Sequence, residues 1–147
     1  MSPTIRPAAE SDRPDWDRLY AGYVAFYRVT QTPEMRDRVW GWIHDPGHGT
    51  EALVAESVGG LVGLAHFRPF ARPLSATTGG FLDDLFVDPG ARGTGAGAAL
   101  IAGVEAAGRA RGWSVIRWIT ASDNATAQAL YDRVAKRTPW VTYDIPL

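Results

Sequence analysis

An acidic strand end that runs into a glycine-rich loop and then into a helix is the feature that most constrains this chain. The stretch covers residues 83–100 and reads DDLFVDPGARGTGAGAAL. Glycines at positions 93, 95 and 97 let a ligand approach the backbone, and the first amide N–H groups of the following helix have no intrahelical partners. The sequence therefore predicts an anion site, with phosphate as the expected ligand, beside two carboxylates.

Length and composition limit the classes of protein to which the chain can belong. Its 147 residues are 46% hydrophobic, which predicts one domain over residues 1–147. A net charge of −1, with basic and acidic residues intermixed, gives no basic stripe for a nucleic acid or a membrane surface. The absence of cysteine excludes disulfides and thiolate metal sites. Because no apolar run reaches about 18 residues and residues 1–13 lack a signal-peptide core, we expect a cytoplasmic protein.

Local patterns predict alternating strands and helices. A strand before the glycine loop, a helix after it and a second strand form a βαβ unit, so these two strands should be parallel neighbours with a right-handed crossover. The pattern predicts a mixed α/β sheet. The expected strands cover residues 4–6, 50–56, 61–67, 80–87, 113–120 and 140–145, and the expected helices run to about residues 27, 43, 111 and 134.

Two familiar phosphate motifs do not fit the loop. Gly90 and Gly95 have Walker A spacing, but Ala96-Gly97 stands where Lys and Ser/Thr are required. The dinucleotide fingerprint needs a third glycine where this chain has Leu100, and it needs an acidic residue about 20 positions later. Neither NTP hydrolysis nor a Rossmann site is favoured, and a glycine-rich turn without a ligand stays open as an alternative.

Two motifs in the second half of the chain point to a family. The pattern Arg92-x-x-Gly95-x-Gly97, followed by Asn124-x-x-Ala127-x-x-Leu130-Tyr131, resembles the signature of the GNAT superfamily of N-acetyltransferases. The acidic pair and the Leu-Tyr ending are most similar to the small polyamine and histone acetyltransferases of the spermidine/spermine type. The resemblance implies the GNAT fold: a mixed, mostly antiparallel sheet with helices on both faces and a parallel βαβ wedge for acetyl-CoA.

The resemblance also implies where acetyl-CoA binds, and it implies no metal. The loop and helix start would hold the pyrophosphate, in agreement with the anion site, and the strand before the loop would pair with the pantetheine arm. Residues on the last helix would line the other side. The implied cosubstrate-binding residues are Leu85, Phe86, Val87, Arg92, Gly93, Thr94, Gly95, Ala96, Gly97, Ala98, Asn124, Ala127 and Tyr131.

The implied reaction is direct attack of a primary amine on the acetyl thioester, the acceptor being a small amine, polyamine, amino acid or protein lysine. A main-chain N–H near the end of strand 82–87 is the candidate donor to the developing oxyanion. Tyr131 matches the family's general acid. Reference pKa values of about 8.5 for a thiol and about 10 for tyrosine make full proton transfer uphill by about 2 kcal/mol. Either the pKa of Tyr131 is lowered in place or the hydroxyl acts mainly as a hydrogen-bond donor.

Asp83 and Asp84 are the other catalytic candidates. A carboxylate with a pKa of about 3.9 falls about 6.5 units, or roughly 9 kcal/mol, short of deprotonating an ammonium group at about 10.4. We therefore assign the pair first to attracting a cationic amine and second to relaying a proton through water. Adjacent strand residues point to opposite faces, so we expect one of the two to face the substrate. The expected partners are a small-molecule amine or a basic peptide.

The remaining features carry less chemistry. His44, His48 and His66 show no metal-ligand spacing and are expected on the surface or in loops. Trp118 is expected in the core. The family's usual Gly-aromatic ending is replaced by the sequence VAKRTPW at residues 134–140.

Paired strands or the first two helices could support a homodimer. Alternatives to an enzyme are a non-catalytic acyl-CoA sensor of the same fold and a structural domain with an empty loop.

Overall fold

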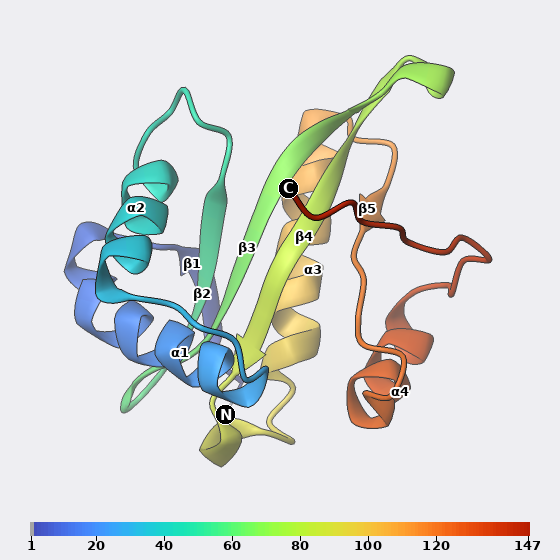
Figure 1. The fold of residues 1–147 in the computed structure, drawn as a ribbon. Helices are drawn as coiled ribbons and strands as arrows, with labels where there is room; N and C mark the ends of the chain where they lie inside the picture. Colours follow the sequence, from blue (N-terminus) through green and yellow to red (C-terminus); the bar gives the residue numbers. More distant parts are fainter. Residues whose placement is uncertain (1) are drawn as a thin grey trace.

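The computed structural model describes residues 2–147, which form five strands and four α-helices (Figure 1). In chain order these are β1 (Thr4–Pro7), α1 (Arg13–Phe26), α2 (Pro33–Ile43), β2 (Glu51–Ser57), β3 (Gly60–Arg72), β4 (Thr77–Val87), α3 (Ala96–Arg111), β5 (Ile116–Arg117) and α4 (Ala125–Val134).

The strands form one sheet in the order β1-β2-β3-β4-β5, in which only the β4–β5 pair is parallel within the described residues. Helices α1 and α2 cover one face and α3 covers the other (Figure 1). This confirms the expected mixed, mostly antiparallel sheet with a parallel βαβ unit. The α1 face buries Trp16, Leu64 and Phe86, and the α3 face buries Phe67 and Leu100.

Short-range signals set where the helices begin and end. Pro33 occupies the first turn of α2, and the hydroxyl of Thr32 caps that helix by accepting a hydrogen bond from the Met35 amide at 3.2 Å. Helix α3 ends at Gly112, whose φ of +72° is the left-handed conformation that glycine adopts without strain. These ends agree with the expected ones.

Two expected strands differ from the structure. The strand expected over residues 113–120 shortens to the two residues of β5, because the Trp113 ring lies against Gly80 and the chain turns away from β4 after Arg117. Within the part of the chain that the structure describes, residues 140–145 are in no strand. They have no neighbouring strand with which to pair, and a strand without a partner leaves its amides to water.

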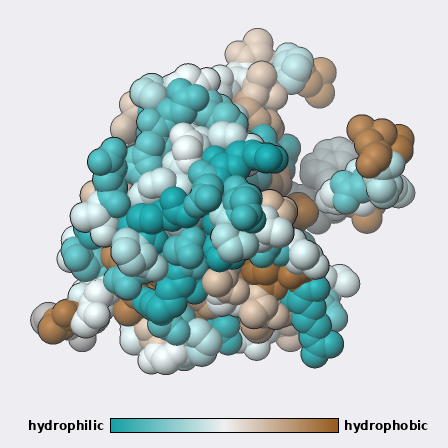
Figure 2. Space-filling view, turned by 60° about the vertical axis from the view of Figure 1, so that its left-hand side comes forward, coloured by the Kyte–Doolittle hydropathy of each residue, from teal (hydrophilic) through white to brown (hydrophobic). Residues whose placement is uncertain are grey.

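The surface is uneven in polarity. The side that carries α1 and α2 is mostly hydrophilic, whereas strongly hydrophobic residues stand out on projecting parts of the chain (Figure 2). The most exposed apolar side chains include Val58 and Leu74 in two hairpin turns and Leu147 at the C-terminus. Among residues 2–147, no helix combines the length and the apolar character that crossing a bilayer requires.

Candidate active site

The parallel strands β4 and β5 separate soon after they meet. They pair only at Gly80–Ile116 and Phe81–Arg117, whereas β4 continues to Val87. The backbone of residues 82–87 therefore faces a gap on the β5 side, where an extended ligand could hydrogen-bond to it as an added strand. The expected wedge lies here, between β4 and the segment that leads to α4 (Figure 1).

A β-bulge interrupts β4 at the acidic pair. On β3, His66 pairs with Asp84 and Phe67 with Leu82, so Asp83 has no opposite residue. A bulged residue leaves the hydrogen-bond ladder and redirects the side chains around it. The bulge thus changes the simple alternation expected from the sequence. It lies at Asp83, four residues before Val87, the strand end at which an oxyanion donor is expected.

A small cavity opens at this gap. It has a volume of about 30 Å³, enough for one or two water molecules. Tyr131 and Asp83 share its wall, and the buried hydroxyl oxygen of Thr120 has no hydrogen-bond partner there. A buried orphan hydroxyl is the kind of group that a ligand or a water molecule satisfies. The lining residues are Tyr23, Tyr27, Leu82, Asp83, Leu85, Trp118, Ile119, Thr120 and Tyr131.

Tyr131 is held by aromatic packing on α4. Its ring lies edge-on to Trp118 with ring centroids 5.4 Å apart. Burial, and secondarily the neighbouring Tyr27, raise the pKa of the Tyr131 hydroxyl. The hydroxyl is therefore protonated at neutral pH and can donate a hydrogen bond into the cavity. Of the two alternatives left by the sequence, a lowered pKa is wrong for the protein without ligand. Trp118 is half-buried at the cavity wall and packs against the core.

Asp83 has one basic neighbour. The Nε of Arg68 lies 3.0 Å from Oδ2 of Asp83, and the Arg68 guanidinium stacks 4.9 Å from the centre of the Phe81 ring. Partial burial raises the pKa of Asp83, although the hydrogen bond from Arg68 acts in the opposite direction. A carboxylate with a raised pKa is a better proton acceptor than a fully solvated one.

Asp84 lies in a buried network that the sequence did not reveal. Nδ1 of His66 is 2.8 Å and the hydroxyl of Tyr20 is 3.1 Å from the same oxygen, Oδ2, of Asp84. On the other side of the imidazole ring, the indole N–H of Trp16 donates to Nε2 of His66 at 2.9 Å. Trp16 and His66 are both fully buried.

The expectation that His66 lies on the surface is wrong. Its side chain is 2% exposed, because residues 61, 64, 65 and 67 of β3 are buried around it. The sequence feature that could have indicated the burial of His66 was its position inside an apolar strand, directly opposite the strand that carries the acidic pair. His44 instead contacts Trp40 of α2 edge-on, and His48 stacks on Trp42 of the same helix.

The network controls the ionisation of its members. Burial alone would raise the pKa of Asp84, but its hydrogen bond and electrostatic interaction with His66, followed by the hydrogen bonds from Tyr23 and Tyr20, outweigh it, and the net pKa is lowered. The pKa values of Tyr20 and Tyr23 are raised, first by burial and then by the charge of Asp84. Asp84 is therefore a carboxylate surrounded by protonated hydroxyls.

The glycine loop has the geometry of an anion site. Gly93 and Gly95 have φ values of +83° and +84°, and no atom lies within 4 Å of the place that a Cβ would occupy on either residue. Helix α3 makes its first backbone hydrogen bond from Ala99 to the carbonyl of Gly95, at 3.0 Å, so the amides of residues 96–98 precede the intrahelical ladder. Three free amides at a helix N-terminus suit a pyrophosphate.

Two side chains of this loop act locally. The hydroxyl of Thr94 donates to the carbonyl of Ala91 at 2.5 Å, which tightens the turn. Arg92 is exposed, and its guanidinium lies 5.3 Å from the centre of the Phe26 ring. The loop can therefore offer a ligand its main-chain amides and one flexible cation.

Helix α4 approaches the start of α3 at Gly97. A Cβ on Gly97 would lie 3.2 Å from the side chain of Leu130, so the glycine lets the two helices approach closely at this point. Asn124 caps α4 by accepting a hydrogen bond from the Ala127 amide at 3.2 Å. That Asn124 and Ala127 line the acetyl-CoA site stays a prediction.

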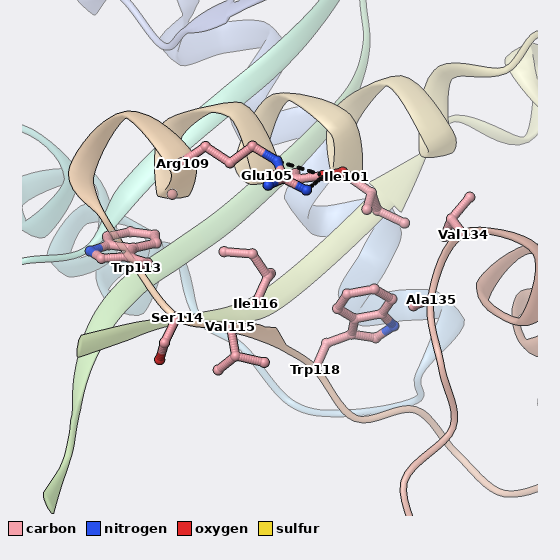
Figure 3. Close-up of a pocket in the computed structure, with 11 residues that line it drawn as sticks. Ile101, Glu105, Arg109, Trp113, Ser114, Val115, Ile116, Trp118, Val134 and Ala135 are labelled. Carbon is pink, nitrogen blue, oxygen red and sulfur yellow. Dashed lines mark hydrogen bonds and ion pairs between the residues drawn. The ribbon is translucent and has the colours of Figure 1, made fainter. Parts of the chain in front are cut away.

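A second cavity lies elsewhere and contains none of the predicted catalytic residues. It has a volume of about 250 Å³ and lies between α3 and β5 (Figure 3). Its two charged residues, Glu105 and Arg109, pair with each other at 2.7 Å, and Trp113, Ile116 and Trp118 form an apolar wall. Among the described residues, no cluster of three His, Cys, Asp or Glu side chains could hold a metal ion.

Comparison with known proteins gives a consistent result. The sequence model of the acetyltransferase (GNAT) family matches residues 16–135. A D-amino-acid N-acetyltransferase of Saccharomyces cerevisiae is 28% identical over 142 residues, covering 95% of this chain and 88% of that protein. A ribosomal-protein-alanine N-acetyltransferase from Brucella melitensis biovar Abortus 2308 superposes with a TM-score of 0.83 at 23% identity, covering 100% of both chains. An aminoglycoside acetyltransferase from an uncultured soil metagenomic sample gives 0.80 at 17% identity, covering 98% of this chain and 96% of that one.

Proposed function

Because the chain belongs to the acetyltransferase (GNAT) family and is an N-acetyltransferase, we propose that its acceptor is a small, positively charged primary amine of the polyamine type. The observation that carries this proposal is the pair of carboxylates at the β4 bulge. Asp83 lines the cavity that also contains Tyr131, and the next residue, Asp84, is ionised. Two adjacent negative groups attract a cation and repel an anion.

Acetyl-CoA is the cosubstrate that this family generally uses, and the residues of this chain fit it. We propose that the free amides of residues 96–98, with Arg92, hold its pyrophosphate, and that residues 85–87 pair with its pantetheine arm. When bound, acetyl-CoA supplies a thioester whose acetyl carbon the amine nitrogen attacks, so that a C–N bond forms as the C–S bond breaks.

The side chains in the cavity wall and beside it then have separate roles. Asp84, which does not line the cavity itself, attracts the ammonium group by its charge. Asp83, whose pKa is raised, accepts the proton of the amine through a water molecule. The Tyr131 hydroxyl, whose pKa is raised, donates a hydrogen bond to the sulfur, which leaves as a thiolate. The amide freed at the bulge is the candidate donor to the developing oxyanion.

A second acceptor class is favoured by one comparison. The yeast relative is named a D-amino-acid N-acetyltransferase, and an amino acid carries a carboxylate that requires a cation in the site. Arg68 is the cation nearest to the cavity wall, but it is already bound to Asp83. The local charge therefore favours an amine without a carboxylate over an amino acid.

A thiol-release assay with acetyl-CoA separates these classes. The panel contains spermidine, putrescine, D-lysine, D-phenylalanine, kanamycin and a lysine-containing peptide. We expect the highest kcat/KM with spermidine or putrescine. A preference for the D-amino acids would contradict the assignment of the carboxylates as the specificity determinant, and no turnover with any amine would contradict the proposed acceptor class altogether.

A further inference from the structure

We propose that Trp16 and His66 are positioning residues that keep Asp84 fully negative, so that the ammonium group of the acceptor is the only cation that neutralises it. The inference rests on the proposed amine acceptor. It concerns two buried residues that have no role in the chemistry described above, and it starts from the hydrogen bonds of a single imidazole ring.

The direction of these hydrogen bonds follows from chemistry. An indole nitrogen can donate a hydrogen bond but cannot accept one. Because Nε1 of Trp16 lies 2.9 Å from Nε2 of His66, this Nε2 must be the acceptor and carries no proton. The proton of the neutral ring is then on Nδ1, which donates to Asp84 at 2.8 Å. The contacts thus select one neutral tautomer of His66.

The tautomer decides the charge of the pair. A carboxylate beside a histidine commonly favours the imidazolium form, and such a pair has no net charge. Here a second proton on Nε2 would face the Trp16 N–H, donor against donor. Trp16 cannot move aside easily because it is 0% exposed, packs against Trp40 with ring centroids 4.8 Å apart and lies beneath the Arg13 guanidinium. His66 therefore donates a hydrogen bond without donating charge.

The other groups around Asp84 do not neutralise it either. From α1, Tyr20 and Tyr23 are protonated phenols with raised pKa values. From β4, Asp83 adds a second carboxylate, and the nearby cation of β3, Arg68, is bound to Asp83. Helix α2 contributes Trp40 behind Trp16, and His44 lies edge-on to Trp40, one aromatic ring further from Asp84.

Asp84 is consequently charged and largely shielded from water, with 19% of its side chain exposed. The hydrogen bonds from His66 and Tyr20 both reach Oδ2, and Tyr23 is a further donor to the carboxylate. A buried carboxylate without a cationic partner is costly, and a protonated amine that binds here removes this cost. The network therefore strengthens amine binding in particular and has no comparable effect on acetyl-CoA.

The first experiment measures the tautomer directly. Nitrogen-15 NMR of histidine-labelled wild-type protein at pH 7, with no ligand, should show His66 with a protonated Nδ1 and an unprotonated Nε2. The Trp16→Phe spectrum assigns the resonance, since loss of the indole donor shifts the Nε2 signal of His66 alone. An imidazolium, or a proton on Nε2, would overturn the proposal whatever the substrate of the enzyme is.

The second experiment measures the consequence for binding, with spermidine as the probe amine. In Trp16→Phe the indole donor is gone, so the Nε2 atom of His66 can take a second proton as the pH falls. We expect the KM for spermidine to rise at least fivefold between pH 8 and pH 6 in this variant, with a much smaller change in kcat. Wild type should change less than twofold, and so should Trp40→Phe, the matched control, which alters the adjacent ring without touching His66.

A double variant separates charge from packing. Asparagine at position 66 can donate to Asp84 but cannot become cationic, so Trp16→Phe/His66→Asn should recover a flat pH profile for KM. A purely structural role would make the double variant worse than Trp16→Phe, and this result would reject the proposal. If Trp16→Phe does not fold, the wild-type NMR measurement still decides. If the tautomer is as expected but no amine is acetylated, only the proposed acceptor fails.

Discussion

The hydroxyl of Tyr131 is kept protonated by its surroundings, and this makes its removal informative. Tyr131→Phe should lower kcat about 10- to 100-fold, as expected for the loss of a hydrogen bond to a charged leaving group, about 1.5–3 kcal/mol, while the Kd for CoA changes less than about threefold, because ring packing on Trp118 is retained. Stopped-flow turnover and calorimetry measure the two quantities. Tyr143→Phe, on the exposed C-terminal segment, is the matched control. Equal losses in kcat and CoA affinity would assign Tyr131 to binding instead.

Asp12, the residue before α1, gives the stability of the protein a pH dependence. It accepts hydrogen bonds from two nitrogens of Arg6, at 2.7 and 2.9 Å, and from the Ala9 amide. The pKa of Asp12 is lowered, and the hydrogen bond from Arg6 is the main cause. The pKa of Asp12 is thus lower in the folded protein than in the unfolded chain, where it is about 3.9. The stabilisation from Asp12 is therefore complete above about pH 4 and is lost as the pH falls through the pKa of the folded state.

The corresponding variant is Asp12→Asn. At pH 7 we expect the free energy of unfolding to fall by about 1–2 kcal/mol, as for hydrogen bonds to a charged group that lies at the edge of the core. Urea titrations should show that the difference from wild type shrinks below about pH 4. Asp37→Asn removes an exposed partner of Arg13, and it should cost less than about 0.5 kcal/mol. A difference that does not depend on pH would contradict this account of Asp12.

At the scale of elements, the loop before α3 depends on its backbone conformation. Gly95 has a φ of +84°, where a Cβ is strained even though no atom lies near it, so Gly95→Ala should destabilise the protein by about 1–2 kcal/mol. Because relaxation of the loop would move the free amides, CoA binding should weaken about tenfold. Gly90→Ala, in the same loop without a positive φ or a nearby atom, should change either quantity little. Similar effects at both positions would exclude a conformational cause.

The same elements show what the sequence could and could not predict. The ends of α2, α3 and α4 were predictable because Thr32, Gly112 and Asn124 act on their own helix, within a few residues. The short β5 was not, since its length depends on where Trp113 meets β4. The Asp84 network was also missed, because Trp16 and His66 are 50 residues apart in the chain and only the folded sheet brings them together.

At the scale of the whole molecule, the C-terminal segment, residues 136–147, stands out because no other part of the chain covers it. All of its residues are exposed, and apolar side chains recur at every second position from Val141 to Leu147. Alternation of this kind is typical of a strand with one buried face. The free edge of β5 and the apolar wall of the 250 Å³ cavity lie beside α3 (Figure 3).

The homodimer considered from the sequence stays a prediction. The C-terminal segment suggests how the two copies would bind each other. We expect the segment of one copy to pair with the β5 edge of another, because an exposed edge and an unpaired amphipathic strand satisfy each other. Sedimentation at 50 µM should then show a dimer for wild type and a monomer for the double variant Tyr143→Ser/Ile145→Ser, whose side chains lie on the apolar face. Leu74→Ser, at an equally exposed hairpin turn, should stay dimeric. A monomeric wild type would contradict the proposed pairing of the C-terminal segment with β5 of a second copy. A dimer that the double variant does not affect would place the interface elsewhere, with α1 and α2 as the remaining candidates.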